Sequence, residues 1–343
     1  MKRQILIMVF FMYIAGRLLS QANTATLFDI KSPLDIKLSL SVKEIRKSRE
    51  DTLYLSHKLY YRNASGIYDS IKIGLKGRGN SRMQICYFPP LWVKIQKKDA
   101  KGTVFEGNKK VKLVVPCEGQ KDGNDLILRE YLCYKLYEIV TPYAFRTRLV
   151  NIELTERRKK KTDTWRQKGI MIEDVDKTAK RFNATELNET KLSAAALHDT
   201  SALRFDMFQF MIANTDWSKG FQHNSKLIYQ KPNVIPIPYD FDMSGLVDAP
   251  YAVVSQINGE QLPIESVTQR YYRGHCRSHD LTEFVRKEFL SREGKFLATT
   301  DELKNELPSK EIEEIKEYLE HFFTILKDDD SFEREVVSRC REL

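Results

Sequence analysis

Alternating apolar and polar positions fill most of the first 175 residues and indicate β-strands. The apolar positions are rich in β-branched residues, and turn-forming residues separate the stretches. We expect strands at residues 34–41, 52–61, 70–76, 91–97, 110–115, 145–154 and 168–175.

One helix interrupts this β-rich part, from Asp125 to about Val140. Its apolar residues recur every three or four positions and so form a single stripe along the helix. The stripe consists of Leu128, Leu132, Leu136 and Ile139.

From residue 190 onward the pattern is mostly helical. A strand pair at 225–229 and 234–238 breaks it, and the tail from 282 to 340 is charged and amphipathic. The order of elements predicts an α+β chain with a β-rich part at 23–172 and a helical part at 173–343.

The N-terminus has the layout of a secretory signal peptide. Lys2 and Arg3 precede an apolar run of about a dozen residues, and Ser20 and Ala22 supply the small residues of a cleavage site. The run is shorter than the roughly 20 residues of a spanning helix, although an uncleaved anchor remains an alternative. We predict a signal peptide at residues 1–22, no membrane span after cleavage, and export to the periplasm, envelope or exterior.

Composition and charge exclude several classes of protein. The 343 residues are 42% hydrophobic and 30% charged, which is usual for a globular chain and excludes a disordered, collagenous or coiled-coil one. Removal of the signal peptide takes away three cations and lowers the formal charge from +9 to +6. Because this excess is spread along the chain, we expect no nucleic-acid partner. One basic run, Arg157 to Lys161, fits either an anionic partner or a solvated hairpin loop.

The five cysteines are an odd number for an oxidising compartment. Cys86 lies just before one expected strand and Cys117 just after another, so our leading hypothesis is a Cys86–Cys117 disulfide. Cys133 lies on the apolar side of the helix and is expected to be a buried free thiol. No cysteine or histidine cluster has the spacing of a zinc site.

Candidate chemistry concentrates between residues 214 and 248. Asp216 follows an apolar helix, Asn224 precedes the first strand of the predicted pair, and Asp240 follows the second. A hairpin between them would bring these three side chains to one point. Oxygen ligands of this kind suit a Mg²⁺ ion that also holds phosphates, and Asp216 could accept a proton from a nucleophile. Taken singly, an Asp at a helix end often only caps the helix, and Asp-x-Asp often forms a turn.

Several short stretches resemble the spore-coat-protein-H (CotH) kinase family, and the closest likeness is to exported proteins of Bacteroidetes that share its pattern. The resemblance covers roughly residues 28–280. Its stretches are Lys76–Ser81, Cys86–Leu91, Lys110–Val114, Leu128–Leu132, Ile172–Asp174, Asn214–Trp217, His223-Asn224 and Tyr239–Gly245.

The resemblance implies a two-lobed, atypical protein-kinase-like fold with a β-rich small lobe and a helical large lobe. It also implies ATP and Mg²⁺ (or Mn²⁺) as cofactors. For the small lobe it implies that Gly77, Arg78 and Gly79 form a loop that covers the phosphates and that Lys94 binds the nucleotide. It also implies that Glu130 forms an ion pair with Lys94 and that Glu173 lies near the adenine.

For the large lobe the resemblance implies Asp216 as the catalytic base and Asn224 and Asp240 as metal ligands. Asp242 would be an additional or alternative ligand. Other lysines compete with Lys94 for its role, namely Lys76, Lys97, Lys98 and Lys112.

These features predict an exported enzyme that transfers a phosphoryl or nucleotidyl group from Mg-ATP to a protein hydroxyl at the envelope or exterior. An alternative is an exported pseudokinase that acts as a binding or structural protein. A third hypothesis is metal-dependent hydrolysis by Asp216, Asp240 and Asp242. The oligomeric state stays open.

Overall fold

The computed structural model describes residues 26–343 except 50–52, 80, 119–121, 189–190 and 258. The predicted signal peptide therefore lies outside the described residues. Within the described ranges, no helix is both long and apolar enough to cross a membrane.

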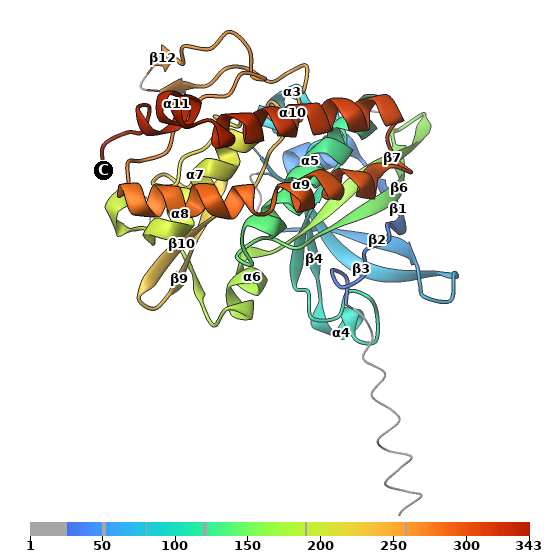
Figure 1. Ribbon diagram of the computed structural model, residues 1–343. Helices are drawn as coiled ribbons and strands as arrows, with labels where there is room; N and C mark the ends of the chain where they lie inside the picture. Colours follow the sequence, from blue (N-terminus) through green and yellow to red (C-terminus); the bar gives the residue numbers. More distant parts are fainter. Residues whose placement is uncertain (1–25, 50–52, 80, 119–121, 189–190, 258) are drawn as a thin grey trace, which may run out of the picture.

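Seven strands in the first half of the chain close into a barrel, in the order β1-β2-β3-β4-β5-β7-β6 (Figure 1). Most neighbours are antiparallel, and the barrel is closed by parallel pairing of β1 with β6. The strands are β1 (Leu34–Leu40), β2 (Leu55–Arg62), β3 (Tyr68–Gly77), β4 (Leu91–Ile95), β5 (Lys110–Val114), β6 (Thr147–Arg157) and β7 (Thr162–Glu173).

The predicted two-lobed kinase-like fold is wrong, because these strands form a closed barrel instead of the sheet of a small kinase lobe. The individual strands are confirmed at nearly the expected positions. The closing pair joins Leu34 to Val150 and Leu40 to Glu156. More than a hundred residues separate these partners, so no local pattern in the sequence indicates their pairing.

Inward side chains of the barrel are apolar and buried, as the alternation along each strand requires. The barrel core includes Leu38, Leu59, Ile73, Val93, Val111 and Ile152. Most charged positions of β1 to β5 point outward, whereas Arg148 and Glu156 of β6 share the inward side with Val150 and Leu154 and are buried.

Three short helices accompany the barrel: α2 (Val42–Lys47), α3 (Ser81–Ile85) and α4 (Lys97–Ala100). The predicted long helix is confirmed as α5 (Asp122–Val140), and its apolar stripe is buried in a second core outside the barrel. This core also receives Ile170 and Ile172 from β7 and phenylalanines of the C-terminal helices, such as Phe208 and Phe322.

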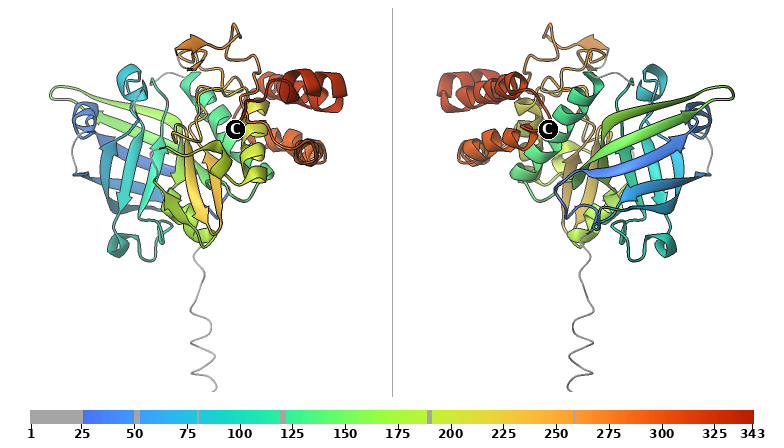
Figure 2. Two further views of the ribbon diagram at one scale, coloured as in Figure 1. Left: turned by 90° about the vertical axis from the view of Figure 1, so that its left-hand side faces the viewer. Right: turned by 90° about the vertical axis from the view of Figure 1, so that its right-hand side faces the viewer.

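The C-terminal half is mainly helical, and Figure 2 shows α8 to α10 at the end of the molecule opposite the barrel, with α5 and α7 between them. Its helices are α6 (Val175–Arg181), α7 (Asp199–Met211), α8 (His279–Leu290), α9 (Glu293–Thr300), α10 (Ser309–Lys327) and α11 (Asp329–Phe332). Its strands are β8 (Thr185–Leu187), β9 (Ser225–Gln230), β10 (Asn233–Pro238), β11 (Gln256–Ile257) and β12 (Glu260–Gln261).

The predicted hairpin between Asn224 and Asp240 is confirmed. Strands β9 and β10 pair antiparallel, with Ser225 opposite Pro238, and the Tyr239 amide donates to the Asn224 carbonyl at 3.1 Å. The two ends of the hairpin therefore hold Asn224 and Asp240 side by side.

Two disulfides are present. The predicted Cys86–Cys117 bridge is confirmed, and Cys133 is a buried free thiol, as expected. A second bridge joins Cys276 to Cys340. The basic run between β6 and β7 is an exposed hairpin loop in which Arg158 and Lys161 both pair with Asp163.

Removal of either bridge should lower the free energy of unfolding by about 2–4 kcal/mol, because a crosslink restricts the unfolded chain. The loss should be larger for Cys276→Ala with Cys340→Ala than for Cys86→Ala with Cys117→Ala, since the bridged residues are 64 rather than 31 positions apart. Urea unfolding followed by circular dichroism measures both values. Dithiothreitol should destabilise the native protein but not the variant that lacks all four cysteines. Equal curves for the native protein with and without reductant would contradict both bridges.

Candidate functional site

A cavity of about 630 Å³ lies between the outer face of β4 and β5 and the loops that flank the β9–β10 hairpin. Its lining combines cations with carboxylates. The cations are Arg78, Arg82, Lys110, Lys112 and Lys226, and the carboxylates are Asp174, Glu186, Asp216, Asp240 and Asp242. Such a mixture fits a ligand that carries phosphates together with a metal ion.

Six of the residues singled out in the sequence line this cavity: Arg78, Gly79, Asp216, Asn224, Asp240 and Asp242. The other four lie outside its lining. Gly77 ends β3, where its amide donates to Ser48 Oγ at 3.2 Å and a Cβ would meet the Ile45 carbonyl at 2.8 Å. Its role is therefore close packing.

Lys94 lies on the exposed part of β4, with its ammonium 5.3 Å from the centre of the Tyr54 ring. Glu130 is buried on α5 and pairs with Arg82 instead of with Lys94. Glu173 is also buried, and it accepts hydrogen bonds from Thr178 and Arg181. Glu130 therefore pairs with Arg82 and not with Lys94. The contacts of Glu173 are with neighbouring side chains of the fold, so its role is structural.

The lysine that reaches the cavity is Lys112 on β5, one of the alternatives left open by the sequence. Its side chain is 3% exposed, and its Nζ lies 3.7 Å from the centre of the Tyr239 ring without a hydrogen-bond partner. Burial lowers the pKa of Lys112 well below its ordinary value, and nearby Arg78 lowers it further. A buried ammonium without an acceptor is unfavourable, so an anionic ligand in the cavity would offset this penalty.

Asp216 lies in the loop after α7, where neighbouring groups fix its carboxylate. His223 Nε2 is 2.8 Å from Oδ1, and Asn224 Nδ2 donates to Oδ2 at 2.9 Å. Asn214 Oδ1 accepts from the Asp216 amide at 3.0 Å. The hydrogen bond to Asp216 raises the pKa of His223. A carboxylate in a cavity beside an imidazole can accept or return a proton.

Asp240 and Asp242 follow β10 and point into the same cavity. Asp240 has a φ of +65°, and its amide donates to the Tyr134 hydroxyl at 3.0 Å. Its carboxylate is 4.0 Å from the Arg78 guanidinium. Burial and the nearby Asp240 charge raise the pKa of Asp242 to about 6. Left-handed backbone at Asp240 and also at Asn224, with a φ of +47°, is typical of functional loops.

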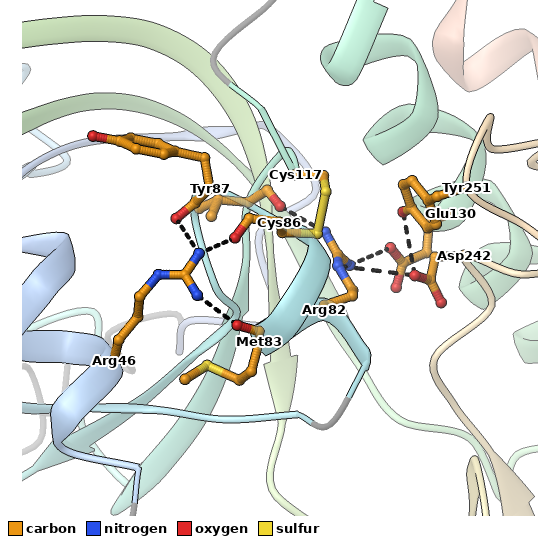
Figure 3. The surroundings of a disulfide bond; sticks show 10 residues. Arg46, Arg82, Met83, Cys86, Tyr87, Cys117, Glu130, Asp242 and Tyr251 are labelled. Carbon is orange, nitrogen blue, oxygen red and sulfur yellow. Dashed lines mark hydrogen bonds and ion pairs between the residues drawn. A yellow bond between two sulfur atoms is a disulfide. The ribbon is translucent and has the colours of Figure 1, made fainter.

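Sequence reasoning missed Arg82, the buried cation that faces Glu130 and Asp242 (Figure 3). Arg82 Nη1 is 3.6 Å from Glu130 and Nε is 3.8 Å from Asp242, while Nη2 donates to the Val115 carbonyl at 2.8 Å. Burial raises the pKa of Glu130 to about 8 even with Arg82 beside it. Asp242 also accepts from the Tyr251 hydroxyl at 3.2 Å.

Arg82 belongs to α3, and contacts on both sides hold this helix in place (Figure 3). The Cys86–Cys117 bridge ties the end of α3 to the segment after β5. On the other side, the Arg46 guanidinium donates to the carbonyls of Met83, Cys86 and Tyr87. The only sequence signal for this arrangement is the position of Arg82 one helical turn before Cys86.

The oxygen donors in the cavity fit Mg²⁺. Asp240 and Asp242 supply carboxylates, and Asn224 supplies an amide oxygen opposite its bonded Nδ2. Among the described residues no three His, Cys, Asp or Glu side chains form a preformed cluster. Mg²⁺ commonly takes only one or two carboxylates and completes its shell with phosphates and water, so this donor set is sufficient.

No family model and no curated protein matches the chain. The CotH resemblance therefore stays a prediction.

Replacement of Lys112 by methionine should raise the free energy of unfolding, and the gain should be larger at pH 6 than at pH 9. The depressed pKa means that the unfolded chain binds a proton at Lys112 that the native protein resists, so the native state loses stability as the pH falls below the ordinary lysine pKa. Urea unfolding at both pH values measures the effect.

Lys94→Met is the matched control, because Lys94 is exposed on the neighbouring strand. It should change stability little at either pH. An equal change in both variants would contradict the burial of the Lys112 ammonium.

Proposed function

We propose that the protein binds a nucleoside triphosphate with Mg²⁺ in this cavity and transfers a phosphoryl or nucleotidyl group to a protein hydroxyl. The observation that carries the proposal is the convergence of the unpartnered Lys112 with Asp216, Asn224 and Asp240 on one cavity. A volume of about 630 Å³ lies within the usual range for ligand sites, roughly 300–1,000 Å³.

The cations of the cavity would bind the phosphates. Lys112 and Arg78 enter from the barrel side, and Lys226 enters from β9. Arg78 also lies 5.2 Å from the centre of the Trp92 ring and 4.0 Å from Asp240. This arrangement orients an anionic chain between the barrel and the hairpin.

Asp240 and Asp242 would hold the Mg²⁺ together with the Asn224 amide oxygen. A bound Mg²⁺ would neutralise phosphate charge during transfer. Arg82 keeps the Asp242 carboxylate in place from behind.

Asp216 would serve as the base. The oxygen of the attacking hydroxyl forms a bond to phosphorus, the bond from phosphorus to the leaving oxygen breaks, and the hydroxyl proton passes to the Asp216 carboxylate. His223 and Asn224 hold that carboxylate from two sides, so its orientation is fixed before a substrate arrives.

We also propose that the protein works outside the cytoplasm. Two disulfides support this, because such bridges persist in oxidising compartments. The signal-peptide layout of the N-terminus agrees with it.

ATP with Mg²⁺ should stabilise the protein against heat. A ligand at about 100 times its dissociation constant adds roughly 2.7 kcal/mol to the native state, which differential scanning fluorimetry detects. Lys112→Met and Asp240→Asn should abolish this stabilisation, whereas Lys94→Met should keep it because Lys94 lies outside the cavity. Failure of every nucleotide to stabilise the native protein would refute the proposed function.

Asp216→Asn should keep the nucleotide-dependent stabilisation but lower nucleotide turnover by about 10²–10⁴-fold, the usual contribution of a general base. Release of phosphate or pyrophosphate from ATP measures turnover, and Asp248→Asn, outside the lining of this cavity, is the control. Stabilisation by ATP without turnover in the native protein would instead favour a binding protein.

A further inference from the structure

The outer face of the barrel beside the cavity carries lysines that form no ion pair with an acidic residue in the described part of the chain. Strands β2 to β5 contain seven Lys or Arg residues and a single acidic residue, Asp69. We define the lysine face as Lys58 on β2, Lys72 and Lys76 on β3, and Lys94 on β4.

The strand register places these four side chains on the same side of the sheet. Lys58 lies directly opposite Lys72 on the neighbouring strand. Lys94 lies opposite Gly74, which is midway between Lys72 and Lys76. Residues two apart on a strand, and residues opposite each other on paired strands, share a face.

None of the four lysines forms an ion pair with any other described residue. Elsewhere on the barrel several outward cations have acidic partners. Lys37 and Arg166 both pair with Glu153, and Lys168 pairs with Glu306. The direct Lys58–Lys72 pair is unfavourable in the isolated protein, because like charges opposite each other destabilise a sheet.

Aromatic rings lie between these lysines. The Lys94 ammonium is 5.3 Å from the centre of the Tyr54 ring, and the Lys58 ammonium is 5.8 Å from that of Tyr60. A Cβ at Gly74 would meet Tyr54 Cβ at 2.7 Å, so the glycine leaves space for Tyr54 to pack against the sheet. The face therefore offers both charge and aromatic surface.

The lysine face continues into the cavity. Lys94 lies opposite Lys110, and Lys76 lies opposite Trp92. Lys110 and Trp92 both line the cavity, so a chain bound along the face would lead toward Asp216 and Asp240.

We propose that the lysine face is a docking surface for an acidic segment of a partner protein. The proposal depends on charge complementarity, since four lysines without an ion pair among the described residues, on strands with no acid between them, attract an extended chain of carboxylates. The same partner would supply the hydroxyl group that accepts the phosphoryl or nucleotidyl group. This part of the proposal rests on the proposed function.

Fluorescence anisotropy with labelled polyglutamate of twenty residues tests the docking surface at low and moderate salt. The native protein should bind, and its affinity should fall as salt rises. Lys58→Glu with Lys72→Glu should weaken binding by about tenfold or more, since a reversed charge repels the probe. Lys159→Glu with Lys160→Glu, in the exposed hairpin loop, makes the same change of charge and should alter binding by less than about threefold.

Three results would overturn the proposal. These are absence of binding, equal loss in both double variants, and much tighter binding of single-stranded DNA or polygalacturonate than of polyglutamate. Nucleotide-dependent stabilisation, measured in the same variants, keeps the two hypotheses apart. If no nucleotide stabilises the native protein, the proposed function is refuted. Binding of polyglutamate to the lysine face would still be supported by the anisotropy measurement.

Discussion

Parallel pairing of β1 with β6 is the constraint on which the rest of the molecule depends. It closes the barrel, and apolar side chains from the strands fill the interior. The lysines of β2 to β5 alternate with these apolar residues and therefore face outward. Part of that outer face is covered by the C-terminal half and becomes the cavity, and part stays exposed as the lysine face. Both surfaces are therefore consequences of one closure.

Several buried charges lie at the cavity or directly beside it. Arg82, Lys112, Glu130 and Asp242 are all at most 6% exposed, although charged side chains are rarely buried unless they are well paired. The contacts of Arg82 with Glu130 and Asp242 are longer than hydrogen bonds, and Lys112 Nζ has no acceptor. A stable fold without a ligand would favour apolar residues at such positions. Their grouping at one cavity is expected of a site whose charges are completed by something that binds there.

The sequence predicted what depends on neighbours along the chain. Strand alternation, the apolar stripe of α5 and the β9–β10 hairpin are all local patterns. The hairpin alone was enough to predict from the sequence that Asn224 and Asp240 lie close together. Barrel closure joins residues far apart, and it was missed. Lys94 and Lys112 occupy similar positions on adjacent strands, and only the cover supplied by the C-terminal half separates the exposed lysine from the buried one. The role of Arg82 depends on Glu130 and Asp242, which are far from it along the chain, and the lysine face gathers residues from three strands.

Each of the two disulfides restrains a different segment next to the cavity. Cys86–Cys117 fixes the helix that carries Arg82 against the segment after β5. Cys276–Cys340 holds the chain end beside Arg273, because Arg341 Nε donates to the Arg273 carbonyl at 2.8 Å. Arg273 in turn donates to the Thr215 carbonyl next to Asp216. Each bridge thus limits the motion of an arginine that supports a carboxylate of the cavity. A site assembled from a barrel, a hairpin and loops needs such restraint, because its side chains come from segments that no single sheet or helix holds together.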